Sequence, residues 1–234
     1  MQYSDMVEAT FLKRLNRFVA HVRLDGREIA CHVKNTGRCR ELLVPGAAVW
    51  LQKAPNPRRS TGYDLVTVRK GERLVNIDSQ APNVAFGEWL QRGSFLPGMR
   101  AVRREVAFGS SRFDFCIETE TVSHFVEVKG VTLEVEGIVL FPDAPTLRGV
   151  RHLKELALAV ERGFGAHVVF VVQMKGVRHF VPNWAMHEDF GLALQAAAAA
   201  GVGVTALDCL VTPDTLLVDA PVPVHLGRED LPPA

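Results

Sequence analysis

The segment RFDFCIETETVSHFVEVKG, residues 112–130, constrains the fold more strongly than any other part of the chain. Polar and apolar residues alternate along it, as they do on a half-buried β-strand. With a four-residue loop at 119–122, the two arms form an antiparallel hairpin in which Glu127 faces Asp114 and Lys129 lies on the same side. The predicted reverse side is apolar throughout: Phe113, Phe115, Ile117, Val126 and Val128.

Two opposed carboxylates destabilise a sheet, so Asp114 and Glu127 need a compensating charge. A divalent cation, Mg²⁺ or Mn²⁺, would supply it by binding carboxylate oxygens. Such a cation polarises a phosphoryl group and lowers the pKa of a bound water, and Lys129 would orient that water or balance phosphate charge. We therefore predict a metal-dependent phosphodiester hydrolase with Asp114, Glu127 and Lys129 as catalytic residues. Glu105 is a candidate third metal ligand or, equally, a surface acid.

Simpler interpretations of this segment stay open. A lone Glu-x-Lys on a strand most often belongs to a solvated face. A register shifted by one residue would turn Asp114 to the opposite side and disperse the site. The hydrolase prediction therefore depends on the register of the hairpin.

The chain after residue 104 alternates strand and helix patterns, which indicates an α/β layout. The apolar run VVFVVQM is typical of a buried central strand. A helix is expected from its N-cap at Thr146 to Glu161. Its expected apolar stripe comprises Leu147, Val150, Leu153, Leu156, Ala157 and Val160, and its polar face comprises Arg148, Arg151, His152 and Glu155. That face either presents its arginines to phosphate with His152 as an auxiliary residue, or is solvated.

The first 80 residues are expected to form about five short strands, the number found in a small barrel such as the OB-fold. Asp25-Gly26 and Lys70-Gly71 indicate hairpin turns, and the first arm is expected to begin near Thr10. A helix follows, with Asn83 as its N-cap and Gly93 just past its end. The predicted organisation is a barrel at 1–80, an α/β domain at 81–226 and a C-terminal tail, expected to be frayed, at 227–234.

Charge is distributed unevenly along the chain. Residues 1–104 contain 18 of the 27 Lys and Arg but 9 of the 26 Asp and Glu. A basic half beside an acidic half suggests a polyanion-binding surface next to a carboxylate site, although two surfaces also differ by chance. The predicted DNA-binding residues are Lys13, Arg14, Arg17, Lys34, Asn35, Arg38, Arg40, Arg58 and Arg59, with Arg148 and Arg151 from the later helix.

The nucleic acid is expected to be DNA bound without strong sequence preference, because no base-reading helix or zinc finger is visible. Trp50 and Tyr63 are candidates for base stacking. A tryptophan in the run AAVWLQ is equally typical of a barrel core.

Other classes of protein find little support. The four cysteines are scattered, without a CxxC pair, and are expected to be reduced thiols. The sequence shows neither a secretory signal nor an apolar run long enough to span a bilayer, so we expect a cytoplasmic protein that does not bind membranes. A phosphate loop, a GxSxG elbow and a dinucleotide fingerprint are also missing, which argues against a sugar-metabolising enzyme.

Four segments resemble the sugar fermentation stimulation protein A family: HVKNTGRCRELLVPGAAVWL, SRFDF, FVEVKGVTL and LFPDAPTLRGVRHLKEL. The resemblance implies an N-terminal OB-fold, a C-terminal PD-(D/E)xK nuclease-like domain, non-specific DNA binding and a regulatory link to sugar (maltose) utilisation. Asp114, Glu127 and Lys129 match the two acids and the lysine of the nuclease motif, whereas Phe113 stands in place of its proline. Pro142-Asp143 follows the Glu-x-Lys and is therefore in the wrong order.

Two functions follow from this resemblance and from the residues. One is a DNA-binding protein that cuts phosphodiester bonds with Mg²⁺ or Mn²⁺. The other is a non-catalytic DNA-binding regulator of sugar metabolism that retains a nuclease scaffold.

Overall fold

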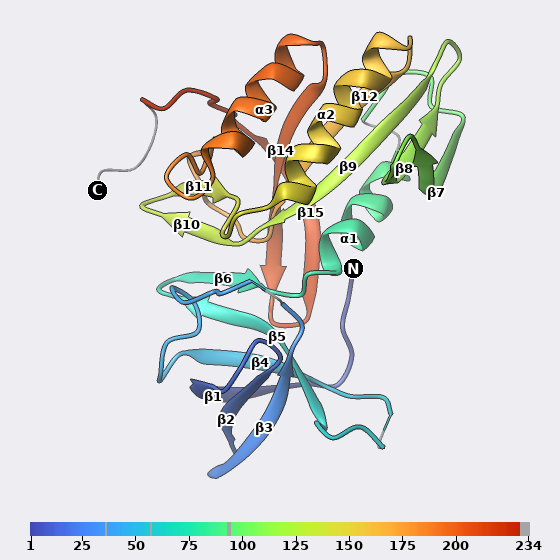
Figure 1. The fold of residues 1–234 in the computed structure, drawn as a ribbon. Coiled ribbons are helices and arrows are strands. Elements are labelled where there is room, and N and C mark those ends of the chain that lie inside the picture. The colour runs from blue at the N-terminus through green and yellow to red at the C-terminus, as the bar shows by residue number, and fades with distance from the viewer. Residues whose placement is uncertain (36, 57, 93–94, 230–234) are drawn as a thin grey trace.

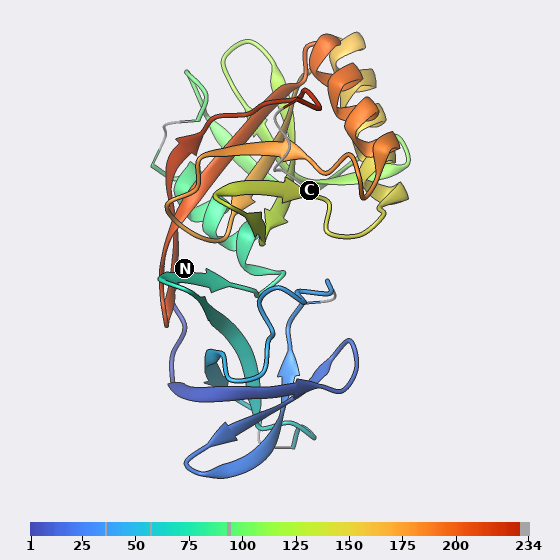
Figure 2. The ribbon, with the colours of Figure 1, turned by 90° about the vertical axis from the view of Figure 1, so that its left-hand side faces the viewer.

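A computed structural model of the chain describes residues 1–35, 37–56, 58–92 and 95–229. The chain forms two parts that lie one above the other in Figures 1 and 2. Strands β1–β6 build the first part, and the elements from α1 onward build the second. The fold is thus an α+β arrangement of two units, as predicted.

The first part is an OB-fold barrel. Its sheet has the order β3-β2-β1-β4-β5-β6, and a parallel pairing of β3 with β5 closes it. Asp25 and Gly26 both have positive φ, 49° and 77°, which is the geometry of a two-residue hairpin turn that follows the twist of its strands. The strands are β1 (Met6–Arg14), β2 (Val19–Leu24), β3 (Arg27–Val33), β4 (Ala48–Lys53), β5 (Tyr63–Lys70) and β6 (Arg73–Asn76).

The first strands of the barrel differ from the prediction. The arm expected to start near Thr10 starts at Met6 and breaks into two strands. The break lies at Asn16, whose Oδ1 accepts hydrogen bonds from the backbone N–H groups of Phe18 (2.8 Å) and Val19 (3.0 Å). An Asn side chain that binds the backbone two residues later forms a turn. This turn produces a loop, 15–18, between β1 and β2.

The second part is a six-stranded sheet with helices on both faces. Its order is β15-β14-β12-β9-β8-β7, and β12 is parallel to both β9 and β14. The first five residues of the run VVFVVQM, 168–172, lie in β12, the predicted central strand. The strands are β7 (Ala101–Phe108), β8 (Ser111–Glu118), β9 (Ser123–Val131), β12 (Gly165–Val172), β14 (Gly203–Thr212) and β15 (Thr215–Val222). A smaller sheet comprises β10 (Leu133–Val135), β11 (Ile138–Phe141) and β13 (His179–Pro182).

Three helices cover the large sheet: α1 (Ala81–Leu90) on one face, and α2 (Leu147–Glu161) and α3 (Glu188–Ala199) side by side on the other (Figure 1). Thr146 caps α2 as predicted, since its side chain accepts a hydrogen bond from the N–H of Gly149. The buried side of α2 is rotated from the predicted stripe: Leu147 is 78% exposed and His152 only 2%. The N-cap of α1 is Gln80, not Asn83, and Gly93 lies outside the described residues.

The two parts share a buried polar interface. Glu134, which is 4% exposed, binds Lys70 (2.7 Å) and Arg73 (2.8 Å) of the barrel. Gln173 Nε2 donates to the carbonyl oxygens of Asn76 and Asp78, each at 3.0 Å. The tip of the β14–β15 hairpin also reaches the barrel beside β6 (Figures 1 and 2). These contacts fix the barrel against the sheet.

Two further expectations meet the structure. All four cysteines are buried and unpaired, as reduced thiols would be. The start of the expected tail is not frayed, because Gly227 accepts a hydrogen bond from Trp184 Nε1 (3.2 Å) and the Arg228 guanidinium lies 4.6 Å from the Trp184 ring centroid. Among the described residues, none of the helices is long and apolar enough to cross a membrane.

Candidate functional site

The predicted acid pair lies where β8 and β9 separate. The observed register joins Phe115 to Val126 and Cys116 to Phe125, which is the predicted register. The pairing of β8 with β9 covers residues 115–118 of β8, so it stops next to Asp114, which is not part of it. There the backbone N–H of Val128 donates to Asp114 Oδ2 at 2.7 Å. The Asp114 carboxylate therefore takes the place of a main-chain acceptor and opens the ladder at the site.

The predicted faces of the hairpin are only partly right. Phe115, Ile117, Val126 and Val128 pack together against α1. Phe113 instead joins the core on the α2 side, where its ring contacts Phe125. The alternation breaks at Asp114, because its backbone no longer follows the regular ladder.

Asp114 is anchored from the α1 side. Asn83 Nδ2 donates to Asp114 Oδ1 at 2.7 Å. Burial and the negative charge of Glu127 raise the pKa of Asp114 to about 6, against the opposing effects of the Val128 N–H, Asn83 and Lys129. The charge of Glu127 therefore acts on Asp114 and favours its protonated form. Asn83 was missed as a site residue because its position suggested a helix cap.

Glu127 is anchored from the α2 side. It is 3% exposed, its Oε1 accepts from Lys129 Nζ at 2.5 Å, and the same oxygen contacts His152 Nδ1. Burial alone would raise the pKa of Glu127, but the hydrogen bonds from His152 and Lys129 outweigh burial and lower it. The second oxygen, Oε2, is buried and has no hydrogen-bond partner among the described residues. A carboxylate oxygen in that state is short of a positive ligand.

The polar face of α2 does approach β9, the strand that carries Glu127 and Lys129. His152 bridges Glu127 and Arg148, whose Nε donates to His152 Nε2 at 3.3 Å. Arg151 is exposed. His152 therefore positions Glu127, while Arg148 and Arg151 stay predicted phosphate contacts.

Asp114 and Glu127 fit a divalent cation. They offer hard oxygen ligands, and the orphan Glu127 Oε2 lacks a positive partner. Glu105 does not complete a set of three: it is exposed, with a left-handed φ of 53°. Within the described parts of the chain, no three His, Cys, Asp or Glu side chains gather closely enough to hold a metal ion. A cation here would thus depend on two acids, with water or substrate oxygens completing its shell.

A cavity of about 150 Å³ opens directly beyond Lys129, between the two parts of the molecule. Gly130 and Asp143 line it from the sheet side, and Asn35 and Gly37 line it from the barrel. A Cβ on Gly37 would lie 2.3 Å from Asp143 Oδ2, so a larger residue here would displace the Asp143 side chain. The barrel loop and β9 therefore line one cleft.

The basic residues of the barrel divide into two groups. Arg14 is committed to its own chain, because all five guanidinium donors bind main-chain carbonyl oxygens, those of Asn16, Arg17, Asn35, Gly37 and Arg38. Lys34 pairs with Asp78 at 2.5 Å and Arg59 with Asp64 at 2.6 Å. Lys13 lies 3.6 Å from Glu28. These cations were predicted to contact DNA, but the structure gives each of them an acid or a carbonyl.

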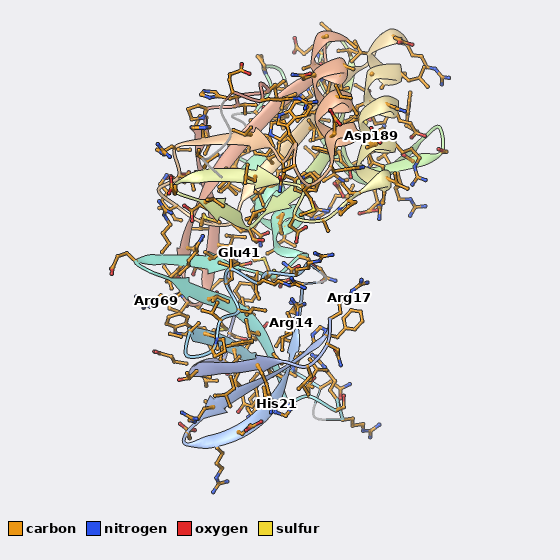
Figure 3. All side chains as sticks on the ribbon, turned by 60° about the vertical axis from the view of Figure 1, so that its left-hand side comes forward. Arg14, Arg17, His21, Glu41, Arg69 and Asp189 are labelled. Atoms are coloured by element: carbon orange, nitrogen blue, oxygen red, sulfur yellow. The ribbon has the colours of Figure 1, made fainter. Side chains whose placement is uncertain are left out.

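The second group is free to face a ligand. Arg17, Arg38 and Arg40 are exposed around a hollow of about 330 Å³, and none of the described residues that line it is an acid. Figure 3 shows Arg14 and Arg17 on the part of the barrel nearer the second domain, and His21 farther from it. We call this site the arginine hollow; it is lined by Arg14, Asn16, Arg17, Gly37, Arg38, Arg40 and Leu43. Arg58 is exposed in the β4–β5 loop.

The side chains of the Asn35–Gly37 turn and the two stacking candidates have structural roles. Asn35 Nδ2 donates to Ile77 O at 2.9 Å, and its Oδ1 accepts from the Gly37 N–H at 2.6 Å; Thr36 lies outside the described residues. Trp50 is 7% exposed beneath Arg69 and belongs to the barrel core. Tyr63 is half-buried. The exposed ring is Phe18 instead, at 50%.

Comparison with known proteins shows similarity to one family over most of the chain. The family model described as the SfsA N-terminal OB domain matches residues 12–77, and the model described as the sugar fermentation stimulation protein RE domain matches residues 80–215. A sugar fermentation stimulation protein homolog of Desulfitobacterium hafniense (strain Y51) is 55% identical over 92% of this chain and 94% of the relative. One of Ruminiclostridium cellulolyticum is 48% identical over 97% of this chain and 100% of the relative.

A solved structure is also similar to this chain. It is the SfsA of Pyrococcus furiosus in complex with Ca²⁺, which superposes with a TM-score of 0.85 at 30% sequence identity. The match covers 96% of this chain and 98% of the P. furiosus chain.

Proposed function

This chain belongs to the sugar fermentation stimulation protein family, and we propose that it binds nucleic acid through its barrel and hydrolyses phosphodiester bonds at Asp114, Glu127 and Lys129. The observation that carries the proposal is the buried, unpartnered Oε2 of Glu127 beside an Asp114 whose pKa is raised to about 6. A purely structural acid pair would be satisfied by hydrogen bonds or replaced by apolar residues.

Asp114 and Glu127 are the residues that would hold Mg²⁺ or Mn²⁺. When bound, such a cation polarises a phosphoryl oxygen and lowers the pKa of a coordinated water. The raised pKa of Asp114 means that a proton compensates the acid pair near pH 6, and a cation would displace it. The P. furiosus relative, solved with Ca²⁺, supports a divalent cation in this family.

The residues around the acids have separate tasks. His152 and Lys129 hold Glu127 Oε1, which leaves Oε2 for the cation. Lys129 is 17% exposed in its side chain and donates to Glu127 Oε1, so its ammonium would balance charge on a phosphate or orient a water beside the acid pair. Asn83 and the Val128 N–H fix the Asp114 carboxylate.

The arginine hollow provides the binding half of the proposal. Its exposed cations suit phosphate groups, and contacts with phosphate carry no sequence information. The hollow shares Gly37 with the cleft beside Gly130. A polynucleotide bound at the hollow would thus extend towards the acid pair, without strong sequence preference.

The test is cleavage of plasmid and single-stranded DNA with Mg²⁺, Mn²⁺ or EDTA. We expect metal-dependent cutting that is lost in Asp114→Asn and in Glu127→Gln. Glu120→Gln is the matched control, because Glu120 is an exposed acid at the tip of the same hairpin and pairs only with Arg100 at 3.2 Å among the ion pairs of the described residues. Unchanged cutting by both site variants would show that the assignment is wrong.

A non-catalytic DNA-binding regulator is the second candidate. The observation in its favour is that two acids, rather than three, approach one another among the described residues. This candidate predicts DNA binding without metal-dependent cutting, whatever the link to sugar utilisation. The same assay therefore separates the two functions.

A further inference from the structure

The loop between β1 and β2 presents an aromatic ring to solvent. Phe18 is 50% exposed, although phenylalanine usually buries most of its surface in a barrel of this kind. It follows Arg17 directly and lies in the loop that the fold class commonly uses for oligonucleotides. A single exposed phenylalanine needs no explanation by itself, so its surroundings decide what it does.

The backbone beneath the ring is held rigidly. The Phe18 N–H donates to Asn16 Oδ1 at 2.8 Å, and the Phe18 carbonyl accepts from the Val33 N–H at 2.8 Å. Arg14 binds the carbonyl oxygens of Asn16 and Arg17 on the same loop. The ring is thus exposed from an ordered loop. A pre-ordered aromatic loses little conformational entropy when a flat ligand packs on it.

Two hollows flank Phe18. Arg17, its neighbour in the chain, lines the arginine hollow. Phe18 itself lines a second hollow of about 160 Å³ that extends to Lys34 and Gln80. Gln80 is the N-cap of α1, and Asn83 in the first turn of that helix binds Asp114. The second hollow therefore extends from Phe18 to the start of the helix whose Asn83 holds Asp114.

We infer that Phe18 is a stacking platform for an unpaired base, with Arg17 and the arginine hollow on the flanking phosphates. The substrate class is then single-stranded nucleic acid, or a duplex with an unpaired segment, because paired bases do not offer a free ring face. Stacking of bases on aromatic side chains tolerates any sequence, which agrees with a site that lacks base-edge readers. This inference rests on the nucleic-acid binding proposed above and adds the strandedness of the substrate.

The test is fluorescence anisotropy with a labelled single-stranded oligothymidylate and a duplex of equal length. We expect Phe18→Ala to weaken single-strand binding roughly 5- to 100-fold, the range for loss of one stacked base. Phe18→Trp should retain it. Leu15→Ala is the control, since Leu15 is 53% exposed on the same loop and has no ring.

The salt dependence separates stacking from charge. Phe18→Ala should leave the slope of log affinity against log salt unchanged, whereas Arg17→Ala should reduce it by about 0.7 for a single strand. Duplex binding should change less than twofold in Phe18→Ala.

Binding by Phe18→Ala within twofold of the wild type, or an equal loss on the duplex, would overturn the inference. Metal-dependent cutting could still occur in that case, so the proposed hydrolysis would stand. Conversely, a Phe18 effect without any cutting would remove the hydrolysis and keep the stacking site.

Discussion

The two parts of the molecule use charge in opposite ways. The barrel keeps Arg17, Arg38 and Arg40 at its surface, where water screens each cation and only a polyanion brings them into concerted use. The sheet buries Glu127, and the negative charge of Glu127 together with burial raises the pKa of Asp114. The comparison teaches that the effect of exposed cations depends on how many of them face a ligand, whereas the effect of a buried acid depends on which groups lie next to it.

Replacing Lys129 should give the largest effect. We expect Lys129→Met to lower metal-dependent cutting roughly 100-fold, the scale for losing a positioned group that handles protons or charge. Titration calorimetry should show that the variant still binds Ca²⁺, since Asp114 and Glu127 remain. Full cutting activity in this variant would assign Lys129 a structural role only.

Arg14 tests whether every barrel cation is interchangeable. Arg14→Ala should lower the free energy of unfolding by about 2 kcal/mol, because the carbonyl oxygens of loops 15–18 and 35–38 lose charge-assisted hydrogen bonds. Arg14→Lys should restore little of it, since an ammonium lacks the planar fork. Urea unfolding measures both. Arg17→Ala is the matched control and should change stability by less than about 0.5 kcal/mol.

His167 sharpens the comparison from the side of the sheet. Its Nε2 lies 3.1 Å from His124 Nδ1, and burial lowers the pKa of His167 to about 4, with a further contribution from His124. In the unfolded chain His167 binds a proton below about pH 6.5, whereas in the folded chain it does so only below about pH 4. The free energy of unfolding should therefore fall as pH decreases from about 6.5 to about 4.

Between pH 7 and pH 5 this single group should cost about 1–2 kcal/mol of stability. His167→Asn should flatten the decline by that amount, as measured by urea unfolding at several pH values. An identical pH dependence in the variant and the wild type would contradict the assignment.

Single cations of the arginine hollow should give the smallest effects. Arg38→Ala and Arg40→Ala should each weaken duplex DNA binding only a few-fold and reduce the salt slope by about 0.9. Arg27→Ala, an exposed cation at the far hairpin between β2 and β3, is the control. Equal slopes for all variants would exclude the hollow as the phosphate site.

The sequence predicted the parts of the site that depend on local pattern. The 112–130 alternation yielded the register of β8 and β9, and a threonine before an amphipathic run yielded the start of α2. The barrel followed from turn signals such as Asp25-Gly26. These features are set by interactions between near neighbours in the chain, which a single sequence displays.

Contacts between distant segments were not predictable in this way. The sequence around Arg14 does not show that its guanidinium donates to carbonyl oxygens of the 35–38 loop. The sequence around Asn83 likewise does not show that its side chain binds Asp114. His152 is polar on an amphipathic helix, yet it is buried because Glu127 needs a partner. Phe18 was the avoidable miss, because Asn16 two residues before it is a turn signal inside an apparent strand.

Glu134 joins the two parts of the molecule, which has a consequence for the substrate. Glu134 is buried and forms ion pairs with Lys70 and Arg73 of the barrel. Together with the hydrogen bonds from Gln173 to the barrel, these contacts leave the barrel and the second part little freedom to rotate relative to one another. The distance from the arginine hollow to the acid pair is then fixed as long as the chain is folded. A strand gripped at one end would meet the acids at a set number of nucleotides from that grip.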